Sequence, residues 1–135
     1  MGSDLKDKIS VVTGGASGIG RSIAIRFSKE GSKVVVADIN EVKGNETVKL
    51  INDAGNKALF IKLDCSNESS IQNCMKQANE WGDNKGIQVL VNNAAAFVFG
   101  HVGGAGSGSG TFTDKNVSLD DWAKVLNTNI VGYAK

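Results

Sequence analysis

Apolar residues are concentrated in four short runs along the chain. The runs cover residues 9–13, 33–38, 58–64 and 87–93. Three of them are almost continuously apolar and rich in β-branched residues, a composition typical of strands buried on both faces of a parallel sheet. We therefore expect each run to form one strand of a single sheet.

Helical periodicity fills the stretches between these runs. Apolar positions recur at spacings of three and four in three groups: Ile19, Ile23, Ala24 and Phe27; Val42, Val48 and Ile51; and Ile71, Cys74, Met75, Ala78 and Trp81. Gly55 is suited to ending the second helix, and Asn67 or Ser66 to capping the third. Strands that alternate with helices predict right-handed βαβ units, and hence a doubly wound α/β domain.

Residues 100–116 break this alternation, because they are rich in Gly and Ser and offer little apolar surface to bury. We expect a surface loop here. A flap over a ligand site and an inserted linker are alternatives that composition leaves open. A further helix is expected after Ser118, which is suited to capping it. Its apolar face comprises Leu119, Trp122, Leu126, Ile130 and Tyr133.

Composition narrows the class of protein. A chain of 135 residues with 15 basic and 14 acidic side chains suits one domain, and its formal charge of +1 gives no sign of nucleic-acid binding. The polar N-terminus is no secretory signal, and the apolar runs are too short to span a bilayer. Cys65 and Cys74 lack metal-ligand spacing, so we expect no metal and two reduced thiols. These features predict a soluble, cytoplasmic protein.

A glycine-rich segment, VVTGGASGIGRSIA, follows the first expected strand and opens the first helix. Gly14 would allow a sharp turn, Gly18 a close approach of backbone amides to a pyrophosphate, and Gly20 close packing of the helix on the sheet. The free N–H groups and the dipole of the helix would favour the negative charge. A tight structural turn without a ligand is the alternative, but the position between strand and helix favours a nucleotide cofactor.

Asp38 ends the second expected strand, about twenty residues after the glycines, where a carboxylate can accept both ribose hydroxyls of an adenosine. A 2′-phosphate there would be repelled by roughly 3 kcal/mol, for a separation near 5 Å and an effective dielectric of about 20. Ile39 and Asn40 follow, so no adjacent cation offsets this repulsion. The sequence therefore predicts NAD rather than NADP. Capping of a surface helix is the alternative role for Asp38.

Four motifs together resemble the short-chain dehydrogenases/reductases. TGGASGIG at residues 13–20 has the glycine spacing of that family, and LDCS at 63–66 resembles its third-strand aspartate. NNAA at 92–95 is similar to the family's Asn-Asn-Ala-Gly, with Ala95 in place of Gly, and NTNIVG at 127–132 resembles its Asn-x-x-Gly. The resemblance implies a Rossmann-like sheet in the order 3-2-1-4, truncated here at the fourth helix.

The resemblance also implies which residues bind. In relatives the third-strand aspartate lies near the adenine, and the Asn-Asn-Ala-Gly stretch steadies the sheet and touches the cofactor through its backbone. Asn129 matches the asparagine that holds a water for proton relay, and would be the one catalytic residue in this chain. The expected cofactor-binding residues are Gly14, Ser17, Gly18, Ile19, Gly20, Asp38, Ile39, Asp64, Cys65, Asn92 and Ala94.

The family's catalytic Ser and Tyr-x-x-x-Lys come later in the chain. Tyr133 and Lys135 are spaced by one residue, so on a helix they point to different faces, and they follow Asn129 too closely. His101 in the Gly-rich loop is expected to be solvated. Residues 1–135 are thus interpreted as an NAD-binding domain whose catalytic C-terminal part is absent, and we expect the chain alone to be inactive.

The function expected by resemblance is NAD-dependent hydride transfer to or from a small alcohol or carbonyl substrate. The expected partners are a homo-oligomer or a complementing C-terminal segment, with neither nucleic acid nor membrane. A non-enzymatic nucleotide-binding or interaction module is the alternative. A methyltransferase-like domain is disfavoured, because its glycine motif would not be expected together with NNAA.

Overall fold

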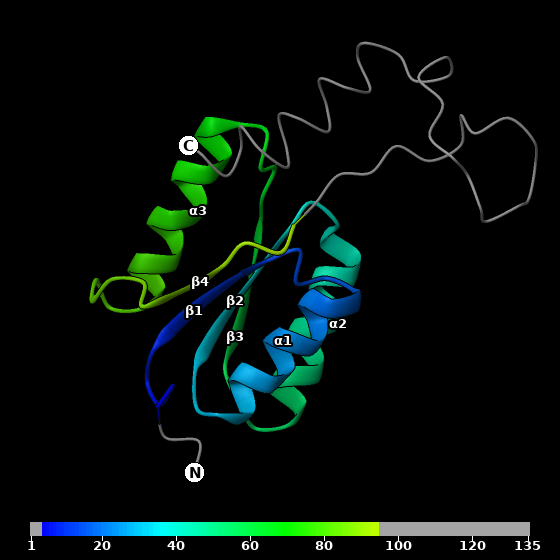
Figure 1. Ribbon diagram of the computed structural model, residues 1–135, viewed down its shortest axis with the longest axis vertical. Coiled ribbons are helices and arrows are strands. Elements are labelled where there is room, and N and C mark those ends of the chain that lie inside the picture. Colours follow the sequence, from blue (N-terminus) through cyan, green and yellow to red (C-terminus); the bar gives the residue numbers. More distant parts are fainter. Residues whose placement is uncertain (1–3, 95–135) are drawn as a thin grey trace, which may run out of the picture.

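Four parallel strands form one sheet in the computed structural model of the chain, which describes residues 4–94 (Figure 1). The strands are β1 (Ile9–Thr13), β2 (Lys33–Asp38), β3 (Ala58–Lys62) and β4 (Val89–Val91). Their order across the sheet is β3-β2-β1-β4, which confirms the expected order. The parallel register places Val11 of β1 between Val35 of β2 and Leu90 of β4.

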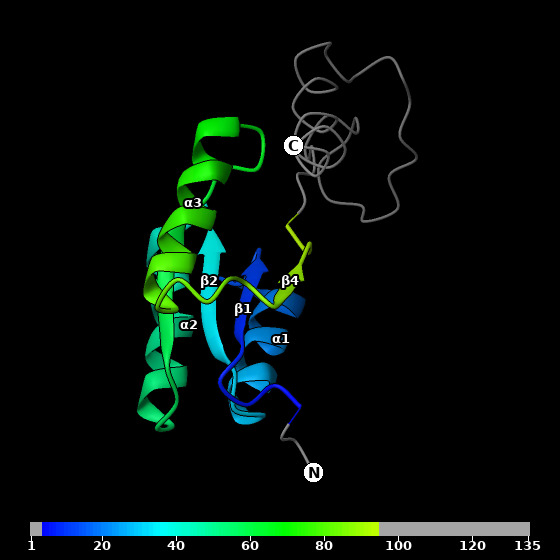
Figure 2. The same ribbon diagram turned by 90° about the vertical axis from the view of Figure 1, so that its left-hand side faces the viewer.

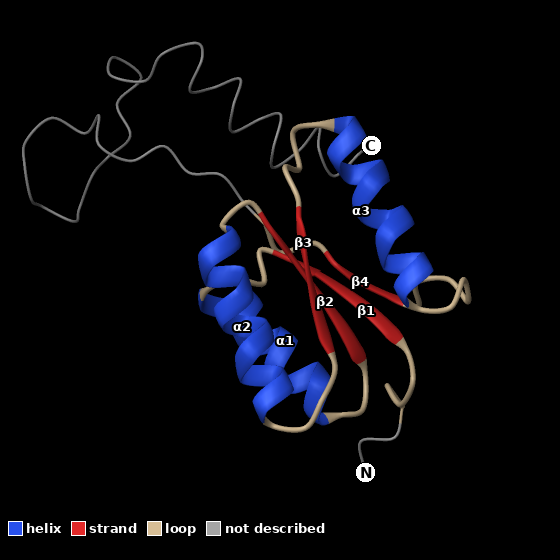
Figure 3. Cartoon of the chain, turned by 180° about the vertical axis from the view of Figure 1, so that it is seen from behind, coloured by secondary structure: helices blue, strands red, loops and turns tan. Residues whose placement is uncertain are grey.

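Three helices cover the two faces of this sheet. They are α1 (Gly18–Lys29), α2 (Glu41–Asp53) and α3 (Glu68–Trp81). Figures 1 and 3 show α1 and α2 together on one face and α3 alone on the other. In the view of Figure 2 the strands are spread side by side, with α3 in front of the sheet and α1 and α2 behind it. The expected doubly wound, Rossmann-like α/β fold is confirmed.

Strict alternation along the central strands builds a core on each face of the sheet. Val11 and Val35 lie in the core on one side, where α3 adds Cys74 and Ala78. The core on the other side includes Val12, Val34 and Val36, with Ala24 of α1 and Ile51 of α2. Successive strand residues point to opposite faces, so a continuous apolar run supplies both cores at once.

Asparagine side chains cap the N-termini of α2 and α3. Asn40 Oδ1 accepts the Lys43 N–H at 3.0 Å, and Asn67 Oδ1 accepts the Ser70 N–H at 3.0 Å. Of the two candidates for capping the third helix, Asn67 is therefore the cap. Gly55 follows the end of α2 in a left-handed conformation, with φ of +86°, which suits its expected role as a stop.

The third and fourth strands are shorter than predicted. β3 ends at Lys62 rather than at residue 64, because Asp64 lies in a turn in which its own side chain accepts the Ser66 N–H. β4 covers Val89–Val91 rather than 87–93. The Asn93 N–H donates to the Thr13 hydroxyl and to the Val91 carbonyl, and not to the backbone of β1. Burial on both faces holds for β1 and β2, whereas the outer strands β3 and β4 are largely half-buried.

Two residues of the predicted helical stripes do not pack. Ile19 is 74% exposed and Val42 is 73% exposed, although both were assigned to apolar faces. Each lies in the first turn of its helix, beyond the carboxyl edge of the sheet, where no strand lies beneath it. The remaining residues of the two stripes, such as Phe27 and Ile51, do contact the core.

Several predictions fall on residues outside the described range 4–94. These are the Gly/Ser-rich loop at 100–116, the helix after Ser118, and the residues Ala95, His101, Asn129, Tyr133 and Lys135. Over residues 4–94, none of the helices is both long and apolar enough to cross a membrane.

Candidate functional site

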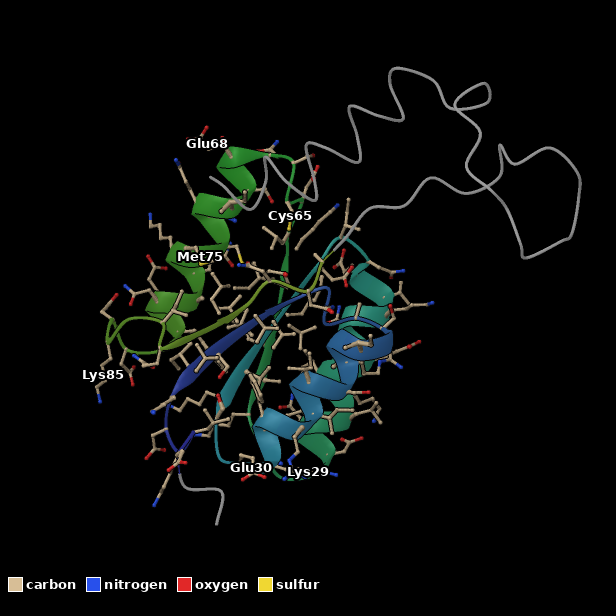
Figure 4. The ribbon with its side chains drawn as sticks, in the orientation of Figure 1. Lys29, Glu30, Cys65, Glu68, Met75 and Lys85 are labelled. Carbon is tan, nitrogen blue, oxygen red and sulfur yellow. The ribbon has the colours of Figure 1, made fainter. Side chains whose placement is uncertain are left out.

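The loops that follow the strands meet at one edge of the sheet. All strands are parallel, so their carboxyl ends lie together, with Thr13 of β1 opposite Ala37 of β2. Figure 4 shows Cys65, which follows β3, at this edge, while Lys29 and Glu30 mark the opposite end of the molecule. In open α/β sheets this is the edge at which ligands bind.

The three motif glycines of the first loop have different surroundings. Gly14 has φ of +70°, and a Cβ there would lie 2.8 Å from Asn93 Nδ2. A Cβ on Gly20 would overlap the carbonyl oxygen of Gly14. Gly18 also has a positive φ, of +55°, but no atom of the described residues lies within 4 Å of its Cβ position. Gly14 and Gly20 therefore allow the loop and α1 to pack closely, while Gly18 faces open space.

Over residues 4–94, no side-chain cap is found at the N-terminus of α1. Ser17 is the N-cap residue, but its side chain makes no capping hydrogen bond, and no acidic residue lies in the first turn. Ser17, Gly18 and Ile19 are exposed, whereas Gly20 is buried. The first N–H groups of a helix have no partner within the helix. They are therefore available to an acceptor outside the protein, and the helix dipole favours a negatively charged one.

Asp38 links the glycine-rich loop to the start of α2. Its Oδ2 accepts the Ala16 N–H at 3.1 Å and its Oδ1 accepts the Asn40 N–H at 2.9 Å. Asn40, not Asp38, caps α2, so the alternative of a helix-capping role for Asp38 is wrong. The carboxylate is half-buried, and the neighbouring Ile39 is 62% exposed. Each carboxylate oxygen can accept more than one hydrogen bond, so Asp38 retains capacity for a ligand.

The segment after β3 brings a second carboxylate to this edge. Asp64 Oδ1 accepts from the Ser66 N–H at 3.0 Å and from Ser66 Oγ at 2.6 Å. Cys65 is buried, and this burial raises the pKa of its thiol; the charges of Asp64 and Asp38 raise it further. The thiol is therefore protonated at neutral pH and is a poor nucleophile. Cys65 can offer a ligand its backbone rather than a reactive sulfur.

Thr13 ties the glycine-rich loop to the segment after β4, a role that the sequence reasoning missed. Its hydroxyl donates to the Val91 carbonyl at 3.1 Å and accepts the N–H groups of Asn93 and Ala94, each at 3.0 Å. Asn92 is exposed beside them. The available signal was a threonine at the end of a buried strand, because a buried hydroxyl needs hydrogen-bond partners.

Arg21 of α1 and Thr47 of α2 were also missed, and both bind carbonyl groups of the loop. Thr47 is completely buried and donates to the Gly15 carbonyl at 3.0 Å. Arg21 Nη2 donates to the Ala16 carbonyl at 2.7 Å. The signal for Thr47 was its place on the buried stripe of α2, three residues after Gly44 and four before Ile51, because a polar group on such a stripe requires a partner.

The structure thus gathers the expected binding residues of the described range at one edge. The loop at 14–20 is joined to Asp38 through Ala16 and to the 92–94 segment through Thr13. The charge of Asp38 also acts on Cys65, next to Asp64. What results is an exposed helix N-terminus next to the carboxylate of Asp38. This arrangement is suited to a ligand with both a phosphate and hydroxyl groups.

Comparison with known proteins agrees with this arrangement. The family described as short chain dehydrogenase matches residues 8–135. An uncharacterized oxidoreductase from Thermotoga maritima is 36% identical over 129 residues, which are 95% of this chain and 44% of that protein. The 3-hydroxyacyl-CoA dehydrogenase type-2 of Drosophila melanogaster is 36% identical over 95% of this chain and 46% of its own length. The chain therefore spans less than half the length of these relatives.

Solved structures that are similar to this chain include short chain dehydrogenases. A short chain dehydrogenase/reductase from Burkholderia phymatum in complex with NAD superposes with a TM-score of 0.81 and 30% identity, over 97% of this chain and 42% of that one. A short chain dehydrogenase from Burkholderia cenocepacia in complex with NADP gives a TM-score of 0.81 and 27% identity, over 96% and 48% of the two chains.

Proposed function

The chain belongs to the short chain dehydrogenase family, and we propose that it forms the nucleotide-binding part of an NAD-dependent oxidoreductase. The proposed reaction moves a hydride between NAD and a small alcohol or carbonyl substrate. One observation carries the proposal: within residues 4–94, the N-terminus of α1 is uncapped, with open space at Gly18, and lies next to the carboxylate of Asp38.

The residues of this edge fit a dinucleotide. We propose that the N–H groups at the start of α1 bind the pyrophosphate, since Ser17, Gly18 and Ile19 are exposed there. Asp38 would accept the adenosine ribose hydroxyls. The other residues proposed to line the site are Gly14, Gly20, Ile39, Asp64, Cys65, Asn92 and Ala94. The N–H of Ala94 already binds Thr13, so a contact from Ala94 would come from its carbonyl or methyl group.

Asp38 supports NAD over NADP. The structures similar to this chain include one with NAD and one with NADP, so the family alone does not decide. A 2′-phosphate close to the Asp38 carboxylate would be repelled, by roughly 3 kcal/mol if the charges are about 5 Å apart in an effective dielectric near 20. Arg21 donates to the Thr47 hydroxyl, to two carbonyls and to Glu46, which commits this nearby cation to protein acceptors.

Cofactor choice is the test of this proposal. NADH should bind more tightly than NADPH by tenfold or more. Asp38→Ser removes the negative charge and should lower this ratio of affinities. Titration of both nucleotides by fluorescence or calorimetry measures it. Asp53→Ser removes an exposed carboxylate at the far end of α2 and is the matched control, which should keep the ratio. Equal affinity of the unaltered protein for the two nucleotides would contradict the assignment.

Activity is proposed for the complete protein and not for these residues alone. The single tyrosine of the 135 residues is Tyr133, and Lys135 follows it by two positions, so the family's Tyr-x-x-x-Lys is not among them. Asn129 is proposed to hold a relay water. A polypeptide limited to residues 1–135 should bind NADH without dehydrogenase turnover, as measured by nucleotide absorbance with a panel of alcohols and ketones. Turnover that Tyr133→Phe abolishes would instead make this tyrosine catalytic.

A further inference from the structure

The carbonyl side of the glycine-rich loop is fixed by two side chains. Thr47 Oγ1 donates to the Gly15 carbonyl at 3.0 Å, and Arg21 Nη2 donates to the Ala16 carbonyl at 2.7 Å. The two side chains are also joined, because Arg21 Nε donates to Thr47 Oγ1 at 2.9 Å. Thr47 is 0% exposed, so loss of its hydroxyl would leave buried partners unpaired.

The orientation of these carbonyls determines where the next amide points. A peptide unit is planar and trans, so its C=O and its N–H point in opposite directions. The Ala16 carbonyl points to Arg21, and the N–H of Ser17 in the same peptide unit therefore points away from Arg21. In the preceding unit, the Gly15 carbonyl binds Thr47 while the Ala16 N–H binds Asp38. The peptide unit between Gly15 and Ala16 is thus held at its carbonyl and at its N–H. The unit between Ala16 and Ser17 is held at its carbonyl.

We propose that Arg21 and Thr47 are positioning residues for the pyrophosphate of the nucleotide. They turn the carbonyl groups of Gly15 and Ala16 toward α2, which keeps these negative dipole ends away from the anion and leaves the Ser17 N–H directed outward. This inference rests on the proposed function of the site. It assigns the two residues no contact with the reacting atoms.

Two simpler roles for Arg21 make different predictions. As an ordinary surface ion pair it would act through Glu46, whose Oε2 lies 3.2 Å from Nη2, but both side chains are partly exposed and such pairs contribute little. As a long-range attractor of phosphate it would need only its positive charge. A positioning role instead requires the fork of the guanidinium, because Nε and Nη2 contact different partners.

The test compares ligands with and without a pyrophosphate, on the full-length protein. Arg21→Met and Thr47→Val each remove hydrogen bonds with little change of shape, and each should weaken binding of NADH and ADP-ribose about tenfold. Adenosine, which has no phosphate, should bind these variants as it binds the unaltered protein. Arg21→Lys should also lose affinity for ADP-ribose. Thr47→Ser retains the hydroxyl and Glu46→Gln alters only the ion pair, so both should stay within about twofold of the unaltered protein.

The outcomes separate this inference from the function on which it rests. If the unaltered protein binds neither NADH nor ADP-ribose, the proposed function fails. If it binds both and Arg21→Met and Thr47→Val bind equally well, only the positioning role is overturned. An equal loss of affinity for adenosine and ADP-ribose would show that the two residues only support the fold. Full affinity in Arg21→Lys would show attraction by charge alone. Either result overturns the positioning role.

Amide exchange of Ser17 with and without ADP-ribose gives a second readout. The unaltered protein should show ligand-dependent protection of this amide, and Thr47→Val should reduce that protection.

Discussion

Gly18 and Gly20 are two residues apart, yet a side chain at each would meet opposite surroundings. At Gly20 a Cβ would overlap the Gly14 carbonyl, whereas at Gly18 it would extend into open space. A side chain at Gly18 is therefore disfavoured by the φ of +55° and by the ligand proposed to lie there, and not by packing. A substitution at Gly18 therefore tests ligand binding, whereas one at Gly20 would disturb packing.

Gly18→Val should abolish NADH binding, because the branched side chain would occupy the space through which the pyrophosphate approaches the amides. The positive φ should also cost about 1–2 kcal/mol of stability. Gly55→Val is the matched control, since Gly55 has φ of +86° and no atom of the described residues within 4 Å of its Cβ position. Gly55 follows the C-terminus of α2, at the end of that helix away from the candidate site. The control should lose similar stability in chemical denaturation and keep its affinity. Normal NADH binding by Gly18→Val would place the phosphate elsewhere.

The turn glycines and the place of Asp38 at a strand end were predictable from the sequence, whereas the contacts that join these segments were not. The spacing of Gly14, Gly18 and Gly20 and the position of Asp38 at a strand end follow from local geometry, and the sequence displays both. The partners of Thr13 and Thr47 do not, because their acceptors lie on other elements, 78 residues away for Thr13 and 32 for Thr47. Contacts over such separations depend on the packing of the whole sheet, which no local pattern specifies.

At the scale of elements, α2 packs on β3 at Gly44, a residue without a side chain of its own. A Cβ on Gly44 would overlap the ring of Phe60, and Gly44 is a buried residue near the start of the helix. Glycine inside a helix costs roughly 1 kcal/mol relative to alanine. That cost is offset here by the close contact between Gly44 and the aromatic ring.

Gly44→Ala should therefore destabilise the protein, although the substitution favours a helix. Overpacking of about 1–3 kcal/mol opposes a gain in helix propensity of about 1 kcal/mol, which leaves a net loss of up to about 2 kcal/mol. In a Phe60→Leu background the smaller side chain should relieve the overlap, and the same substitution should become neutral or stabilising. A double-mutant cycle by urea denaturation measures this coupling. Equal effects in both backgrounds would show that the ring does not limit the approach.

The bounds of a strand were predicted well where burial alone determines them, and less well where side-chain contacts with other segments do. The apolar runs located β1 and β2 to the residue, because both strands are buried on both faces. The ends of β3 and β4 were overestimated, since the hydroxyl of Ser66 and that of Thr13 bind groups in the segments that follow these strands. Such side-chain hydrogen bonds compete with the strand ladder and leave no periodic signal.

At the scale of the whole molecule, β4 is the least covered strand of the described sheet. It pairs with β1, and over residues 4–94 no strand pairs with its other side. Leu90 is 48% exposed, and Val89 and Val91 are half-buried. Proteins generally protect apolar edges of this kind from other chains. We propose that a further segment of the protein or a second copy of the chain covers β4.

Leu90→Lys tests this proposal by placing a charge on the uncovered strand. A polypeptide of residues 1–135 should self-associate in sedimentation velocity, and Leu90→Lys should shift it toward the monomer, because a charge opposes apolar contact between edges. Leu50→Lys is the matched control: Leu50 is 51% exposed, but it lies on α2, away from the edge, so the substitution should leave the association unchanged. Adding the C-terminal half of a relative, as a continuation or a separate chain, should reduce self-association and slow amide exchange at β4. A monodisperse, thermally robust monomer whose β4 amides are already strongly protected would contradict the proposal, because the edge would then need no partner beyond these residues.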